Sequence, residues 1–193
     1  MMVAIIDYGA GNIRSVQNAL QRLGVEATVT ADSEIIRAAD KVILPGVGEA
    51  KSAMEMLRSK GLDKLIPTLT QPVLGICLGL QLMCVNSEEG DTTGMGIFNA
   101  RVLRFPEKGI VPHMGWNDFT RVSGPLYEGI TQETDMYFVH GYYAEECAET
   151  NAVCEYITRF SASLEKDNFY AAQFHPEKSA EPGQRFLQNF LSL

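Results

Sequence analysis

The chain has 193 residues, of which 46% are hydrophobic and 21% are charged, and its formal net charge is −8. This composition predicts one globular domain over residues 1–193, and the negative charge argues against a general nucleic-acid-binding protein. No stretch has the length and apolar character of a membrane span or a signal peptide, so we expect a cytoplasmic protein with reduced thiols.

The first half of the chain alternates between strand and helix patterns. Strands are expected at residues 2–6, 25–30, 41–44 and 72–76, and helices at residues 12–23, 33–39, 49–60 and directly after Cys77. This alternation predicts an α/β fold, in which a mostly parallel central sheet carries helices on both faces.

The second half is richer in strand patterns. Strands are expected at residues 100–105, 118–122, 136–139, 152–158 and 169–174, and a final helix at residues 182–193. Ligands of open α/β sheets bind beyond the carboxyl ends of the strands, which here lead into the loops at 7–12 and 45–48 and the turn at Cys77. The first loop lacks the third glycine of a dinucleotide fingerprint, so a tight turn is expected there, and we expect neither a cofactor nor a metal.

The segment around Cys77 is the most informative feature of the sequence. An apolar strand pattern runs into this cysteine, and glycines stand two residues before it and two after it, at Gly75 and Gly79. This pattern is typical of a nucleophile on a sharp strand-to-helix turn, where side chains at the flanking positions would clash. A helix N-terminus also favours the thiolate form of cysteine. The alternative is a buried cysteine on a core strand, but glycine inside a strand then needs another reason.

A thiol hydrolase also needs a base and a group that orients the base. The chain has three histidines, and of these only His175 has a carboxylate two residues on, at Glu177. Pro176 lies between them and favours extended geometry, in which residues two apart share a face. We therefore expect Glu177 to hold the imidazole of His175 while that ring reaches Cys77, and we interpret His113 and His140 as structural.

The order of these residues along the chain argues against two common hydrolase classes. An α/β-hydrolase runs nucleophile, acid, histidine, whereas this chain runs cysteine, histidine, glutamate. Papain-like enzymes have the cysteine near the mature N-terminus, where Cys77 does not lie. Acyl transfer also needs N–H groups aimed at the oxyanion, and the Leu78 N–H and the loop at 45–48 could supply two of them. A plain turn is the alternative for that loop.

Together, Cys77, His175, Glu177 and the loop at 45–48 resemble the triad of class I glutamine amidotransferases. Longer strings over essentially the whole chain resemble the glutaminase subunit of imidazole glycerol phosphate synthase: DYG at 7–9, LPGVG at 44–48, GICLGLQL at 75–82, SEE at 87–89, PHMGWN at 112–117, YFVH at 137–140, DNFY at 167–170 and QFHPEKS at 173–179. The string at 112–117 is specific to that subfamily. One departure is Gly141, where the subfamily usually has serine.

The resemblance implies that the chain hydrolyses glutamine to glutamate and ammonia and passes the ammonia to a (β/α)₈ barrel cyclase subunit of a heterodimer in histidine biosynthesis. It implies catalysis by Cys77, His175 and Glu177, with oxyanion N–H groups from Val47 and Leu78. It implies glutamine binding at Gly46, Gly48, Gln81 and Glu89 and at the backbone near Tyr137 and Phe138, and a cyclase interface at Trp116, Asn117 and Lys178.

Two other functions stay open on the sequence. One is a triad glutaminase, a γ-glutamyl peptidase or an amidotransferase that serves a different acceptor, against which the string at 112–117 argues. The other is a non-catalytic scaffold of the same fold, against which the intact Cys77, His175 and Glu177 argue.

A last hypothesis concerns Val47, a β-branched residue between two glycines where an oxyanion donor is required. The peptide between Gly46 and Val47 could rest with its N–H turned away from the site. Turning it inward would give Val47 strained backbone angles, at a cost of about 1–3 kcal/mol. We therefore expect a nearly idle isolated subunit that its liganded partner activates.

Overall fold

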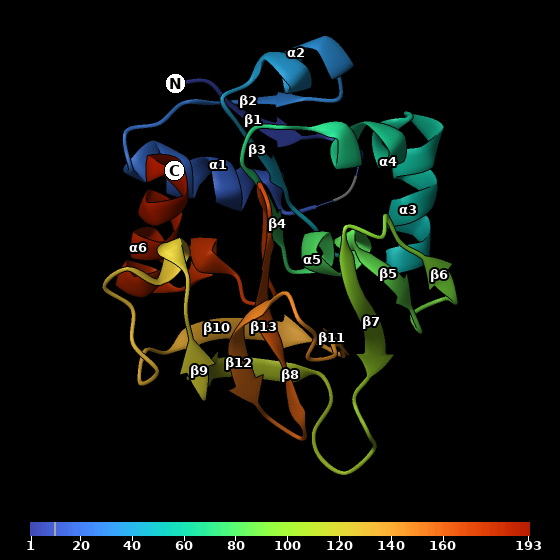
Figure 1. The fold of residues 1–193 in the computed structure, drawn as a ribbon, viewed down its shortest axis with the longest axis vertical. Helices are drawn as coiled ribbons and strands as arrows, with labels where there is room; N and C mark the ends of the chain where they lie inside the picture. Colours follow the sequence, from blue (N-terminus) through green and yellow to red (C-terminus); the bar gives the residue numbers. More distant parts are fainter. Residues whose placement is uncertain (10) are drawn as a thin grey trace.

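The computed structural model describes residues 1–9 and 11–193, and its centre is an eight-stranded sheet in the order β2-β1-β3-β4-β14-β13-β12-β9 (Figure 1). The first five strands pair in parallel with one another: β2 (Ala27–Thr30), β1 (Val3–Ile6), β3 (Lys41–Leu44), β4 (Val73–Ile76) and β14 (Phe169–Ala172). The last three are antiparallel: β13 (Arg159–Lys166), β12 (Thr150–Glu155) and β9 (Arg121–Val122).

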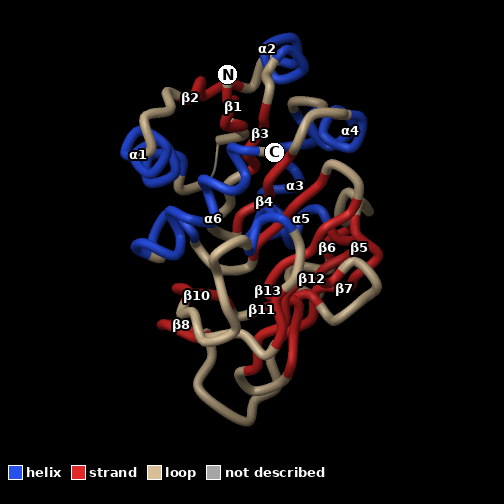
Figure 2. Tube along the Cα trace, turned by 60° about the vertical axis from the view of Figure 1, so that its left-hand side comes forward, coloured by secondary structure: helices blue, strands red, loops and turns tan. Residues whose placement is uncertain are grey.

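Helices cover both faces of the parallel strands, because successive strand residues point to opposite faces and are apolar on both. On β1, Val3 and Ile5 pack in the core cluster that contains α1 (Ile13–Arg22) and α6 (Ala180–Ser192). Ala4 and Ile6 pack in the other cluster, beside α2, α3, α4 and α5. Figure 2 shows α1 and α6 on one side of the strands and α3 and α4 on the other. The remaining helices and short turns are α2 (Ser33–Ala38), α3 (Ala50–Ser59), α4 (Leu62–Leu65), α5 (Leu78–Met83), η1 (Ile66–Thr68), η2 (Pro125–Tyr127) and η3 (Pro176–Lys178).

The second half of the chain adds two smaller sheets, which occupy the lower half of Figure 1. One has the order β11-β7-β5-β6, formed by β11 (Tyr142–Ala144), β7 (Phe98–Arg104), β5 (Cys84–Ser87) and β6 (Thr92–Thr93). The other is the antiparallel pair β8 (His113–Asn117) and β10 (Met136–His140). The predicted α/β class, the parallel sheet with helices on both faces and the strand-rich second half are thus confirmed.

Several predicted boundaries need correction. The strand expected at 118–122 is only the two residues of β9, and the strand expected at 152–158 begins at Thr150 and ends at Glu155. The sequence reading missed α4, β5, β6, β8, β11 and β13. Two of these have strand patterns interrupted by unusual residues: β8 contains Gly115 at a φ of 138°, and β13 contains Ser161 and Ser163 on a buried stretch. The turn predicted at 7–12 includes Ala10, which lies outside the described residues.

None of the helices within the described ranges has both the length and the apolar surface needed to cross a membrane.

Candidate active site

Cys77 lies at the junction of β4 and α5, beyond the carboxyl end of a central strand. Its backbone has a φ of 53° and a ψ of −106°, a combination that non-glycine residues rarely adopt. Its N–H donates to the carbonyl oxygen of Ala172 on the neighbouring strand β14, over 2.7 Å. The sulfur is thus held on a strained turn with only 7% of the residue exposed, and strain of this kind clusters at functional sites.

The glycines around Cys77 are required by close backbone approach. A Cβ on Gly79 would overlap the carbonyl oxygen of Leu44, and one on Gly75 would lie 2.9 Å from the sulfur of Met83. A Cβ on Gly46 would lie 2.6 Å from the nitrogen of Gly79. The helix α5 can therefore begin directly against β3 and β4 only because these positions have no side chain.

His175 and Glu177 form a buried hydrogen-bonded pair, with 2.8 Å between His175 Nδ1 and Glu177 Oε1. The carboxylate accepts, so Nδ1 carries the hydrogen and Nε2 is left for the nucleophile. The sequence predicted that an extended chain places His175 and Glu177 on one face. The chain is extended only at His175 and enters the 3-10 turn η3 at Pro176, and this turn brings Glu177 back to the ring.

Nε2 of His175 is buried and has no hydrogen-bond partner among the described residues, so a full bond to Cys77 is not formed in this state. The two side chains are nevertheless close enough to interact electrostatically. Burial alone would lower the pKa of His175, but its interactions with Cys77 and Glu177 outweigh that effect and raise the pKa above its usual value. The ring is therefore suited to hold the proton of the thiol.

Cys77 and His175 share a cavity of about 270 Å³. Most of the predicted site residues line this cavity: Val47, Gly48, Cys77, Leu78, Gln81, Glu89, His175 and Lys178. The rest of the lining is a wall formed by the end of β10, the start of β11 and the glycine between them: Val139, His140, Gly141 and Tyr142. A volume of this size admits a small polar metabolite and not a macromolecule.

Two glutamine side chains connect this cavity to the sulfur. Gln81 Nε2 donates to the carbonyl oxygen of Tyr142 and to Oε1 of Gln173, each over 3.0 Å. Gln173 Nε2 in turn faces Cys77 Sγ at 3.6 Å. Both hydrogens of the Gln81 amide are thus in use, and only its oxygen remains free. The sequence reading did not include Gln173, although a fully buried amide directly before Phe174 and His175 is a sign of a required partner.

Glu89 approaches the cavity from the loop after β5. Its Oε2 accepts the N–H of Ala50 at the start of α3, over 2.8 Å. Burial and the nearby Glu49 raise the pKa of Glu89, while the Ala50 N–H opposes that rise. The side chain is therefore a partly buried acceptor in the lining of the cavity.

The loop at 45–48 is turned away from the oxyanion position. The Leu78 N–H donates to the carbonyl oxygen of Gly46 over 3.4 Å, so the N–H of Val47, across the same trans peptide, points the other way. This is the resting orientation that the hypothesis from the sequence requires. The preceding carbonyl, of Pro45, accepts the buried hydroxyl of Tyr8 over 3.0 Å, which holds the base of the loop.

Neither Tyr137 nor Phe138 is among the residues that line the described cavity. The N–H of Tyr137 donates to Ser179 Oγ and its carbonyl accepts the N–H of His175, each over 2.9 Å, so its backbone is already occupied. Phe138 points into the core, because strand residues alternate in direction. The wall is formed instead by the next residues, 139–142.

The three predicted interface residues lie in different settings. Trp116 is 54% exposed and packs edge-on against Tyr137, whereas Lys178 is exposed at the rim of the cavity. Asn117 turns its amide inward, to His113 and to the carbonyl oxygen of Glu155. Exposed Met114 is a further apolar residue on the same face of β8, which the sequence reading missed.

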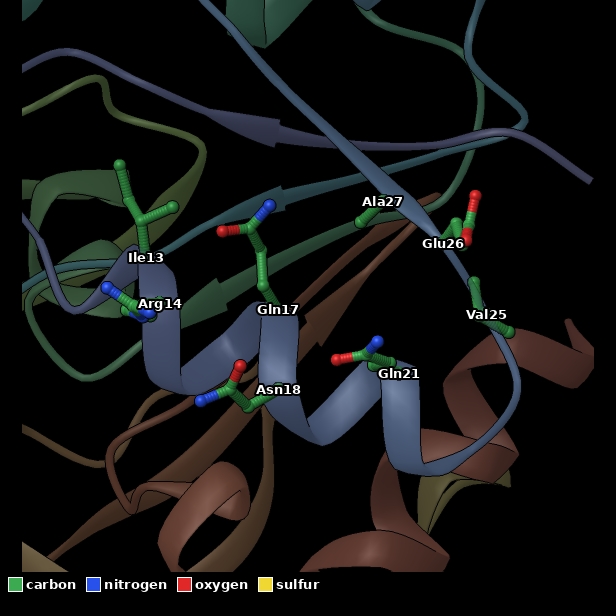
Figure 3. A pocket seen from close by; sticks show the side chains of 8 residues that line it. All are labelled: Ile13, Arg14, Gln17, Asn18, Gln21, Val25, Glu26 and Ala27. Carbon is green, nitrogen blue, oxygen red and sulfur yellow. The ribbon is translucent and has the colours of Figure 1, made fainter.

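A larger cavity, of about 570 Å³, lies along α1 and the segment that enters β2 (Figure 3). Its lining includes the side chains of Arg14, Gln17, Asn18 and Gln21 from one helix. It shares no lining residue with the Cys77 cavity, and its lining contains no cysteine or histidine and one carboxylate, that of Glu26.

Comparison with known proteins agrees with this geometry. The family Glutamine amidotransferase class-I matches residues 4–193. A protein of Bacteroides thetaiotaomicron named imidazole glycerol phosphate synthase subunit HisH is 57% identical over 196 residues, which cover 100% of both chains. A protein of the same name from Yersinia pseudotuberculosis is 46% identical over 196 residues, again with 100% of both chains covered.

A solved structure of a glutamine amidotransferase superposes with a TM-score of 0.76 at 21% identity, covering 98% of this chain and 97% of that one, and supports the fold alone. The identities of 57% and 46% over the full length of both chains place this chain in a narrower group within the family. The chain belongs to the class-I glutamine amidotransferase family and, within it, to the HisH subunits of imidazole glycerol phosphate synthase.

Proposed function

We propose that this glutamine amidotransferase hydrolyses glutamine through a triad of Cys77, His175 and Glu177. The observation on which this rests is the convergence of a strained, nearly buried cysteine and a carboxylate-bound imidazole on one small cavity. A non-catalytic scaffold would gain nothing from this strain.

In the first half of the reaction, Cys77 Sγ attacks the side-chain carbonyl carbon of glutamine and His175 Nε2 takes the thiol proton. The imidazolium returns this proton to the leaving amide nitrogen, so that ammonia departs and a γ-glutamyl thioester remains. Water then attacks the thioester, its proton passes to His175 and back to the sulfur, and glutamate leaves. Glu177 stabilises the imidazolium without taking the proton.

The donors and acceptors of the cavity support a proposal for how the charged ends of the substrate bind. Both hydrogens of the Gln81 amide are engaged, so Gln81 offers an acceptor to the substrate. Glu89 is a second acceptor. Acceptors suit the α-ammonium group. Donors for the α-carboxylate could come from backbone N–H groups and from the ammonium group of Lys178, which also lines the cavity. Gly48, at a φ of 101°, lines the cavity next to Val47, and its backbone N–H is a candidate donor.

We further propose that ammonia passes to a (β/α)₈ barrel cyclase subunit that docks on the paired strands β8 and β10. Met114 is 63% exposed and Trp116 54% exposed, and they pair with Val139 and Tyr137 across the two strands. Val139 also lines the catalytic cavity, so this apolar face begins where the cavity opens. Exposed Lys178, at the rim of the cavity, adds a charged side chain to the proposed docking surface. The docking face supports a heterodimer. The four free thiols support a reducing compartment, the cytoplasm.

The decisive experiment is Cys77→Ala in the complex of this chain with the cyclase. Glutamate release should fall by roughly 10³-fold or more, as for other nucleophile deletions. Ammonia added to the buffer should still support the cyclase reaction, which shows that the cyclase itself is functional. Near-normal glutamate release by the variant would reject the triad, and cyclase activity that added ammonia cannot support would reject the proposed partner role.

A further inference from the structure

A buried pair of histidines lies beside the proposed glutamine pocket and has no role in the chemistry above. His113 Nδ1 and His140 Nε2 are 3.0 Å apart, and the two residues are only 3% and 5% exposed. His140 lines the cavity with Cys77, while His113 lies behind it. Two polar rings are thus buried at the back of the wall that faces the substrate.

One end of this pair fixes which nitrogen carries the hydrogen. His140 Nδ1 lies 2.7 Å from the carbonyl oxygen of Tyr142, which can only accept, so Nδ1 is protonated. In a neutral ring, His140 Nε2 must then accept. His113 Nδ1, its neighbour, must therefore donate, and His113 Nε2 is left as an acceptor.

The contacts of Asn117, beside His113, fix the tautomer of the pair independently. Asn117 Oδ1 accepts the N–H of Asp118, and Asn117 Nδ2 donates to the carbonyl oxygen of Glu155, each over 3.0 Å. The amide orientation is therefore set, and it points Nδ2 at His113 Nε2 over 3.3 Å. Both ends thus require the Nδ1–H tautomer at His113 and His140.

The surroundings keep the pair neutral. His113 is stacked between Phe138 and Tyr156, with ring centroids 5.0 and 4.1 Å away, and Phe160 meets His140 edge-on. Burial lowers the pKa of His113 to about 4 and that of His140 to about 3. A proton on His113 Nε2 or on His140 Nε2 would also make that nitrogen face the N–H group of its neighbour. Each hydrogen bond in this chain therefore has only one possible donor.

The carbonyl of Tyr142 joins this pair to the proposed substrate site, because it also accepts Gln81 Nε2 over 3.0 Å. We propose that His113 and His140 are positioning residues, which as a neutral pair with fixed tautomers hold the Tyr142 carbonyl, and through it the Gln81 amide, in the geometry that binds glutamine. This inference rests on the proposed glutaminase function, with Gln81 as a glutamine ligand.

The first test does not depend on activity. Nitrogen-15 NMR of the imidazole rings separates protonated from unprotonated nitrogens. At neutral pH, His113 and His140 should each show one protonated Nδ1 and one unprotonated Nε2. An Nε2–H tautomer or a charged ring at either residue would overturn the proposal, whatever the kinetics show.

The second test uses His113, which does not line the cavity. In the complex with the cyclase, His113→Phe removes the hydrogen bond to His140 and should raise KM for glutamine roughly fivefold, the effect of one buried hydrogen bond, with kcat changed less than about twofold. His113→Gln restores a donor and an acceptor and should recover most of the KM.

The matched control is Tyr127→Phe, which removes a buried 2.6 Å hydrogen bond to Ser163 elsewhere in the core. It should lower stability and leave KM unchanged. An unchanged KM in His113→Phe, or an equal rise in the control, would overturn the positioning role. Near-normal glutamate release by Cys77→Ala would instead reject the proposed triad, while the tautomer result stands.

Discussion

The Gly46–Val47 peptide is the feature from which basal activity can be calculated. In the described state its carbonyl occupies the Leu78 N–H, so neither proposed oxyanion donor faces the substrate. Turning the peptide over breaks this 3.4 Å hydrogen bond, which is long and contributes about 0.5–1 kcal/mol. It also gives Val47 strained backbone angles, which cost about 1–3 kcal/mol. The sum of about 1.5–4 kcal/mol leaves about 7% to 0.1% of the isolated chain in the competent orientation.

Replacing Val47 with glycine removes the steric part of this cost. We expect Val47→Gly to raise the basal glutaminase rate of the isolated chain about 5- to 150-fold, the factor that corresponds to about 1–3 kcal/mol. The assay is glutamate release at saturating glutamine, without the partner. Val47→Ala keeps the Cβ and should recover only a small part of the increase.

The complex with the liganded partner is the control for correct folding of the loop. If the loop folds normally, Val47→Gly must still hydrolyse glutamine in that complex. A basal rate equal to the wild type, with the complex fully active, would show that backbone strain at Val47 is not the brake. An isolated wild-type chain as fast as the complex would show that there is no brake, and it would leave the triad unaffected.

Three further predictions concern the support of the site. Glu177→Gln keeps an acceptor for the catalytic imidazole but removes its charge, so kcat should fall by less than the roughly 10³-fold expected for loss of the nucleophile, with KM nearly unchanged; an equal loss of binding would indicate a structural role. Gly79→Ala should lower the free energy of unfolding by about 3 kcal/mol or more through backbone overlap, whereas Gly141→Ala, whose Cβ meets only ordinary contacts, should change it by less than about 1 kcal/mol in urea unfolding. Because burial lowers the pKa of His113 and His140, the unfolded chain takes up protons below about pH 6.5 that the folded chain does not, and stability should fall by about 2 kcal/mol per histidine between pH 7 and pH 5. The variant His113→Phe should lose about 2 kcal/mol less over this range, and an equal loss would contradict the assignment.

The parallel half of the fold was predictable because each of its elements has its own local pattern. The strand at 41–44 matches β3 residue for residue, and the turn at Cys77 could be recognised from Gly75 and Gly79, which are required by close backbone approach. The pairing of His175 with Glu177 was also predictable, although the geometry is a 3-10 turn and not an extended chain.

The wall of the cavity was not predictable in the same way. Alternation along β10 shows that neighbours face opposite sides, but it does not show which side faces the cysteine, and Phe138 faces the core. The roles of Gln173 and Asn117 depend on partners more than 35 residues away in sequence, such as Gln81 and Glu155, which no local pattern reveals.

Two kinds of strain in the site have different consequences. The positive φ of Cys77 belongs to the turn itself and is present in the resting state, since the close packing of Gly75 and Gly79 allows no other path. The strain expected at Val47 arises only after its peptide has turned. A partner can therefore activate the site by favouring one peptide orientation while the sheet and the nucleophile stay in place. Val47 and Val139 line the same cavity, and Val139 pairs with exposed Met114 on the proposed docking face, so the docked partner needs to act across only that small cavity. Under this scheme, the nucleophile is held ready before the partner binds, and only the oxyanion donors wait for it.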